Sequence, residues 1–186
     1  MMIKNYFKKE IIFYVIILSL GAGWLFLTPL ISPKTAYEEQ VFPFEGFLAP
    51  DIQLNTPDGQ KVQLSDLRGK PVIINFWASW CPPCRVEMPA LEKTYDHYKK
   101  DGLIVLGINS SYQDDLSIAL PFIQKNGLTF PILLDSNGIA SLKFRVNALP
   151  TSFFIDAKGF IRKIVVGAMP EALLRSEMPA LFLQEH

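Results

Sequence analysis

The two cysteines of the chain, Cys81 and Cys84, are separated by two residues and are the groups best suited to chemistry. They lie in the stretch NFWASWCPPC, where an apolar run leads directly to the first cysteine. Three kinds of site use this spacing: a zinc site, a structural disulfide and a redox pair. The other ligands available and the elements around the pair decide among them.

A zinc site and a structural disulfide both fit the sequence poorly. Structural zinc needs four ligands, generally two such pairs or one pair and two histidines. The only histidines, His97 and His186, do not have that spacing relative to the cysteines. A disulfide between residues three apart closes too small a loop to restrict the unfolded chain much. We therefore expect no metal and no cofactor, and the redox interpretation is favoured.

The elements predicted around the pair suit redox chemistry. Residues 72–78 form a continuous apolar, β-branched and aromatic run, typical of a strand buried on both faces. A helix is predicted to begin at the cysteines, with Pro83 in its first turn. A Cys81 thiolate there would face unpaired amides and the positive end of the helix dipole, which lower the pKa of its thiol. Cys84, one turn further on, would be less accessible and able to attack a mixed disulfide.

Two neighbouring side chains are candidates for supporting roles. Glu87 lies three residues after Cys84 and therefore on the same helical face. From the spacing alone it is either a proton acceptor for the Cys84 thiol or a solvated surface carboxylate. Trp80 immediately precedes the pair and is expected to border the substrate groove, whereas Trp77 is expected in the core.

The N-terminal part of the chain has the pattern of a membrane anchor. Residues 11–31 contain no charged residue, and this run is as long as a membrane-spanning helix. Lys4, Lys8 and Lys9 precede this run, so the positive-inside rule places the rest of the chain outside the cytoplasm. A cleaved signal peptide is the alternative, but the run is longer than an ordinary signal sequence and no good cleavage site follows it. We predict an uncleaved, single-pass anchor.

The remaining sequence predicts one α/β domain. The formal net charge of the 186 residues is zero, which gives no indication of nucleic-acid binding. We divide the chain into a cytoplasmic N-terminus (1–10), a transmembrane anchor (11–31), a tether (32–48) and the domain (49–186). Alternating residues around a Pro57-Asp58-Gly59 turn predict an entrance hairpin. Further strands are predicted at 72–78, 103–108, 131–134, 152–156 and 161–166, and helices at 81–100, 114–126, 138–144 and 170–183. Pro121 is expected to break or kink the helix at 114–126. This order indicates a mixed central sheet covered by helices on both faces.

Several motifs resemble those of a known family. FWASWCPPC is similar to the active site of thioredoxin-fold proteins. Ala49-Pro50-Asp51, Pro57-Asp58-Gly59 and LSDLRGK at 64–70 resemble the lead-in of the ResA/TlpA-type membrane-anchored thiol-disulfide oxidoreductases. The resemblance extends from about residue 49 to the end, and the predicted anchor matches the family's layout.

The resemblance implies a thioredoxin-like fold and a set of site residues. It implies that residues of about 103–134 include a central strand–helix insertion, that Pro150 is cis and lies against the cysteines, and that Asn75 is structural. It also favours Glu87 as the proton acceptor. We expect Cys81, Cys84 and Glu87 to be catalytic, and the substrate to contact Trp80, Pro82, Pro83, Leu149, Pro150 and Thr151.

The resemblance also implies an activity, a place and partners. Members of this family mostly act as reductants in an oxidising compartment, on the haem-site cysteines of apocytochrome c or on cysteines of the oxidase copper site. They receive electrons from a membrane donor of the DsbD/CcdA kind. We therefore expect a cell (inner) membrane protein whose domain lies on the extracytoplasmic or periplasmic side and acts in cytochrome c biogenesis. Pro82 stands where the ResA-like branch commonly has Glu, which leaves the potential and the substrate open.

Three other functions are compatible with parts of the pattern. A thiol peroxidase of the peroxiredoxin type shares the fold, but Ala78 stands where such sites usually have Thr. A Cu(I)-binding chaperone could use the two thiolates, but no Met-rich or nearby His motif accompanies them. A disulfide-forming oxidase would differ only in its reduction potential, because thioredoxin-fold members span roughly −270 to −120 mV.

Overall fold

The computed structural model describes residues 16, 18 and 41–182. The described residues from 41 onward belong to one compact unit that begins at residue 39. The predicted anchor at 11–31 lies outside the described residues except for Ile16 and Leu18, both helical. Within the described part, no helix is both long enough and apolar enough to cross a membrane.

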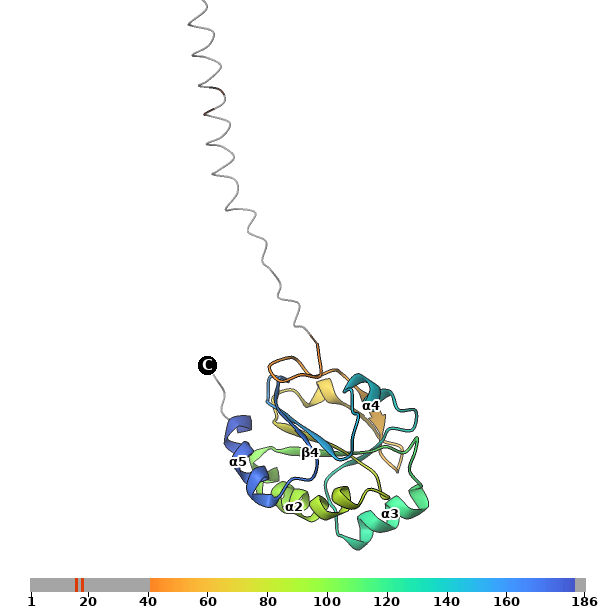
Figure 1. The fold of residues 1–186 in the computed structure, drawn as a ribbon. Coiled ribbons are helices and arrows are strands. Elements are labelled where there is room, and N and C mark those ends of the chain that lie inside the picture. Colours follow the sequence, from red (N-terminus) through yellow and green to blue (C-terminus); the bar gives the residue numbers. More distant parts are fainter. Residues whose placement is uncertain (1–15, 17, 19–40, 183–186) are drawn as a thin grey trace, which may run out of the picture. The chain divides into compact units, whose positions relative to one another are not determined.

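The centre of the domain is a mixed seven-stranded sheet (Figure 1), as predicted. Its strand order is β2-β1-β5-β4-β3-β6-β7. β4 lies between β3 and β5 and is parallel to both. The pairs β1–β2, β1–β5, β3–β6 and β6–β7 are antiparallel. The strands are β1 (Gln53–Asn55), β2 (Lys61–Gln63), β3 (Val72–Trp77), β4 (Ile104–Asn109), β5 (Ile132–Leu134), β6 (Thr151–Ile155) and β7 (Ile161–Val166).

Helices cover both faces of the sheet (Figure 1). Their bounds are α2 (Pro82–Tyr98), α3 (Leu116–Lys125), α4 (Ile139–Lys143) and α5 (Glu171–Phe182), with short 3-10 turns η2 (Leu64–Leu67) and η3 (Lys99–Asp101). Apolar side chains of α2, α3 and α5 share one core cluster, and those of η2 and α4 share the other. The thioredoxin-like arrangement expected from the sequence is therefore present.

β3 lies inside the sheet, between β4 and β6, and its sequence suits that position. Ile73 and Trp77 face the cluster under α2, whereas Val72, Ile74 and Phe76 face the cluster under α4. All six of its residues are buried. Burial on both faces explains why the sequence of β3 is a continuous apolar run. The end of this buried strand is also the point from which the cysteine segment leaves the sheet.

The region between β3 and β6 contains the predicted additional strand and helix. β4, α3 and β5 follow one another here, and β5 lies between β4 and β1. The entrance hairpin β1–β2 joins the sheet through Asn55, which pairs with Leu134 of β5. Gly107 of β4 has no room for a side chain, because a Cβ there would come within 2.8 Å of the Phe130 ring.

The sequence predicted that Pro121 breaks or kinks the helix at 114–126, and the prediction of a break is wrong. α3 continues through this residue as one α-helix. Proline removes a single backbone hydrogen bond. The apolar face formed by Ala119, Phe122 and Ile123 nevertheless packs against the core, and this packing holds the helix in place.

The described residues before Ala49 contact the edge of the sheet. The Gly46 amide donates to the Ile161 carbonyl at 2.8 Å, and the Ile161 amide donates to the Phe47 carbonyl at 2.9 Å. The Glu45 carboxylate accepts from the Ile164 amide at 2.8 Å. Contacts with β7 thus extend into the segment 32–48 for which the sequence indicated a tether.

Candidate active site

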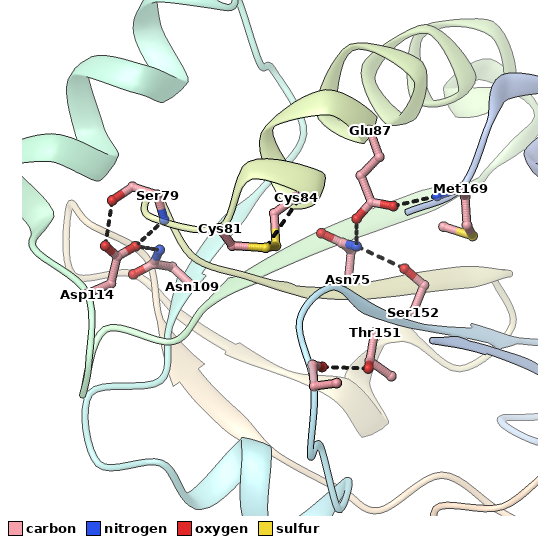
Figure 2. The surroundings of a disulfide bond; sticks show 11 residues. Asn75, Ser79, Cys81, Cys84, Glu87, Asn109, Asp114, Thr151, Ser152 and Met169 are labelled. Atoms are coloured by element: carbon pink, nitrogen blue, oxygen red, sulfur yellow. Dashed lines mark hydrogen bonds between the residues drawn. A yellow bond between two sulfur atoms is a disulfide. The ribbon is translucent and has the colours of Figure 1, made fainter. Parts of the chain in front are cut away.

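The cysteine pair lies where β3 gives way to α2 (Figure 2). Cys81 is the N-cap of α2, and its sulfur accepts from the Cys84 amide at 3.3 Å. The two sulfurs are joined as a disulfide. Cys81 is 3% exposed and Cys84 is 0% exposed. The position at a helix N-terminus and the deeper burial of Cys84 agree with the sequence predictions.

The residues between the cysteines suit the start of a helix. Pro82 and Pro83 occupy the first two helical positions, where an amide proton has no partner within the helix. The first helical hydrogen bond follows, from the Arg85 amide to the Cys81 carbonyl at 3.1 Å. Both prolines are exposed, so they border the cysteines on the surface.

Glu87 lies on the buried face of α2, so its interpretation as a solvated surface carboxylate is wrong. It is 2% exposed and lies on the same side of the helix as the disulfide, the side facing β3 (Figure 2). Asn75 Nδ2 donates to Oε1 at 2.7 Å, and the Met169 amide donates to Oε2 at 2.9 Å. Burial raises the pKa of Glu87 to about 7, although both hydrogen bonds act to lower it.

Asn75 connects Glu87 to the sheet. Its Nδ2 also donates to Ser152 Oγ of β6 at 2.9 Å. Asn75 and Ser152 are directly opposite each other in the β3–β6 pairing, and both are completely buried. A neutral amide at this position can donate to the carboxylate without adding a second buried charge.

The Pro150 loop lies at the same end of the sheet as the cysteines. The Leu149–Pro150 peptide is cis, which confirms this part of the prediction for Pro150. Thr151 begins β6 opposite Phe76 of β3, just before the chain turns toward Cys81. Leu149 is half-buried, whereas Pro150 and Thr151 are buried. The two segments that the resemblance assigned to substrate binding are therefore close together.

The sequence analysis missed Asp114, which was placed only at the start of a predicted helix. In the structure Asp115 is the N-cap of α3, and the Asp114 carboxylate instead accepts hydrogen bonds from Ser79, two residues before Cys81. Trp80 is 56% exposed, with its indole Nε1 donating to the Gln113 carbonyl at 3.1 Å. The two consecutive aspartates were the available signal, because only one of them can cap the helix.

The described part of the chain offers no group of three or more His, Cys, Asp or Glu side chains placed to hold a metal ion. The chemistry that its geometry supports is sulfur chemistry. A cysteine pair at a helix N-terminus, with a buried carboxylate one turn further on, can exchange disulfides and move a proton.

The chain is similar to several known proteins. Residues 46–164 match the AhpC/TSA family. The chain belongs to this family. It is 40% identical over 146 residues to the thioredoxin-like protein YneN of Bacillus subtilis, covering 78% of this chain and 85% of that protein. It is 37% identical to the thiol-disulfide oxidoreductase ResA of Geobacillus kaustophilus, covering 83% of this chain and 84% of ResA.

The fold comparison agrees with this assignment. The crystal structure of StoA from Bacillus subtilis has a TM-score of 0.61 and 32% identity, covering 69% of this chain and 96% of StoA. This AhpC/TSA family protein is thus a ResA-type thiol-disulfide oxidoreductase.

The raised pKa of Glu87 predicts a pH-dependent stability. The carboxyl is protonated in both folded and unfolded states below its ordinary value of 4.5, and the folded state holds the proton up to about pH 7. The stabilisation is therefore complete below pH 4.5 and is lost as the pH rises through 7. With the disulfide intact, the free energy of unfolding of the wild type should fall by about 3 kcal/mol relative to Glu87→Gln between pH 4 and pH 8.

Urea denaturation of the two proteins at several pH values measures this difference. Glutamine cannot accept both hydrogen bonds, so Glu87→Gln should also carry a loss of stability that does not depend on pH. Parallel pH profiles of the two proteins would show that Glu87 does not titrate with a raised pKa.

Proposed function

We propose that this oxidoreductase is anchored in the cell membrane and reduces disulfides of extracytoplasmic proteins through Cys81 and Cys84. The observation that carries the proposal is the placement of the cysteine pair at the start of α2 with the buried Glu87 on the same side of that helix (Figure 2). This arrangement provides a nucleophile, a resolving thiol and a proton acceptor within two turns.

The proposed reaction consists of two exchanges. The Cys81 thiolate attacks one sulfur of the substrate disulfide, whose S–S bond breaks, and the other substrate sulfur leaves as a thiolate. Cys84 then loses its proton and attacks the Cys81 sulfur, which releases the second substrate sulfur as a thiolate. The substrate gains two electrons and, from its surroundings, two protons, while Cys81 and Cys84 become the disulfide seen here.

Glu87 is the proposed acceptor of the Cys84 proton. Both side chains are completely or almost completely buried, so water has little access to either of them. A carboxylate with a pKa of about 7 is partly ionised at neutral pH and can both accept and return a proton. The Asn75 and Met169 donors hold it in position throughout.

The substrate-binding surface is proposed to consist of the exposed residues around Cys81 and the Pro150 loop. Trp80, Pro82 and Pro83 are exposed beside the disulfide, and Leu149, Pro150 and Thr151 lie at the same end of the sheet. The family resemblance favours apocytochrome c or a protein of the oxidase copper site as substrate, and so a role in cytochrome c biogenesis.

The anchor and the electron donor are part of the same proposal. The uncharged run at 11–31 and the three lysines before it support a single-pass anchor with the domain on the extracytoplasmic side. A domain so placed cannot reach cytoplasmic reductants, so it requires a membrane electron donor of the DsbD/CcdA kind.

The reduction potential of the Cys81–Cys84 pair tests the direction of the reaction. Equilibration of the full chain in thiol–disulfide buffers should give a value of about −250 mV or lower, which suits a reductase. A value near −120 mV would overturn the reducing role and make the protein a disulfide donor.

Replacement of Glu87 tests its role in the second exchange. At pH 7 the Glu87→Gln variant should release reduced substrate about 100-fold more slowly than the wild type, because Cys84 loses its proton acceptor. Formation of the mixed disulfide with Cys81 should be almost unchanged. Rapid-quench analysis of the mixed disulfide measures both steps. Asp96→Asn, an exposed carboxylate on the same helix, is the matched control, and equal resolution rates in all three proteins would contradict the role.

The anchor is tested by charges in its apolar run. The full chain expressed in a bacterium should remain in the membrane after alkaline carbonate extraction. Ile17→Lys combined with Leu20→Lys should release it, because a lysine near the centre of a spanning helix costs about 3 kcal/mol. Extraction of the unaltered chain by carbonate would show that it is not anchored, and a shortened chain would indicate cleavage.

A further inference from the structure

The turn before Cys81 is fixed to a segment more than 30 residues further along the chain. The Ser79 amide donates to Asp114 Oδ2 at 2.6 Å, and the Ser79 hydroxyl donates to Asp114 Oδ1 at 2.5 Å (Figure 2). The indole of Trp80 donates to the neighbouring Gln113 carbonyl at 3.1 Å. Both residues that directly precede Cys81 are therefore bound to residues 113 and 114.

The Asp114 carboxylate is itself rigidly held. Asn109, completely buried at the end of β4, donates from Nδ2 to Oδ2 at 2.7 Å. The Asp115 amide donates to Oδ1 at 2.9 Å. Each carboxylate oxygen thus accepts two hydrogen bonds. The side chain joins three segments: the cysteine turn, the end of β4 and the start of α3.

An ionised carboxylate is the group that this arrangement requires. All four partners donate, and a carboxylate accepts through both oxygens without offering a donor. Asparagine has nearly the same shape, but its NH₂ group would face two donors. Because Ser79 is 4% exposed, its amide would then have little access to water as a replacement partner.

The turn held by Asp114 leads directly into Cys81. The Cys81 amide donates to the Ala78 carbonyl at 3.2 Å, which closes the turn around Ser79 and Trp80. Cys81 is then the N-cap of α2, with its sulfur at the Cys84 amide. The amides and the dipole of a helix stabilise a thiolate only when the sulfur stays at that N-terminus.

We propose that Asp114 is a positioning residue for thiol-disulfide exchange, which holds the Ser79–Trp80 turn so that the Cys81 sulfur remains at the N-terminus of α2. Asp114 does not touch the sulfur and acts through the turn. The inference rests on the exchange chemistry of the proposed function but not on its reducing direction.

The reactivity of Cys81 toward iodoacetamide tests this role directly. The full chain is used with Cys84→Ser throughout, so that Cys81 is the only thiol, and its alkylation is followed by mass spectrometry from pH 4 to pH 9. With Asp114→Asn, we expect alkylation at pH 7 to slow by about three- to tenfold and the pKa of the Cys81 thiol to rise. Ser79→Ala, which loses the hydroxyl donor but keeps the amide bond, should show a smaller change in the same direction.

Asp115→Asn is the matched control, because this neighbouring carboxylate caps α3 through the Ser117 amide and does not contact the cysteine turn. It should leave both the rate and the pH profile unchanged. An unaltered Cys81 profile in Asp114→Asn would overturn the proposal. A lower Cys81 pKa would also overturn it, because Asp114 would then act through its negative charge. Should Asp114→Asn fail to fold by circular dichroism, the Ser79→Ala result decides between the same outcomes.

The test separates this inference from the proposed function. Iodoacetamide reports the state of the Cys81 sulfur whether the pair reduces or forms disulfides in the cell. A potential near −120 mV would therefore refute the reducing role and leave the role of Asp114 intact. An unaltered pH profile of Cys81 alkylation in Asp114→Asn would refute the role of Asp114 and leave the reducing role intact.

Discussion

The hydrogen-bond chain from Ser152 through Asn75 and Glu87 to the Met169 amide is the interaction on which the rest of the site depends. It joins β6, β3, α2 and the segment before α5 through four residues that are all buried. Burying a carboxylate costs free energy unless hydrogen-bond donors surround it. These donors keep Glu87 in place under the cysteine helix, and its burial keeps the pKa near neutrality. The sheet and both core clusters provide the framework for this polar chain.

Much of the fold could be predicted because its signals are local. The buried run of β3, the prolines after Cys81 and the strand–turn–strand patterns are all visible within short windows of sequence. Pro121 misled the sequence analysis because a local rule was outweighed by packing of α3 on the core. The cis bond before Pro150 was expected only from the family resemblance, since its local sequence indicates a turn and no more.

The parts of the site that could not be predicted are contacts between distant residues. Glu87 and Met169 are 82 positions apart, and Ser79 and Asp114 are 35 apart. Helical spacing placed Glu87 on the face of Cys84 but could not show whether that face was buried. The presence of Asp114 could be explained locally, as a residue at the start of a helix. Only the tertiary fold shows that its partner is Ser79. Side chains that hold a site in place carry weaker sequence signals than the groups that react.

The hydrogen bonds of residues 45–47 with β7 have a consequence for how copies of the protein meet. An uncovered edge strand offers a row of free amides and carbonyls to another sheet, which favours association. Here the chain's own entering segment occupies the Ile161 amide and carbonyl, and the Glu45 carboxylate occupies the Ile164 amide. The entering segment thus occupies positions on this edge at which a strand of another molecule could otherwise pair.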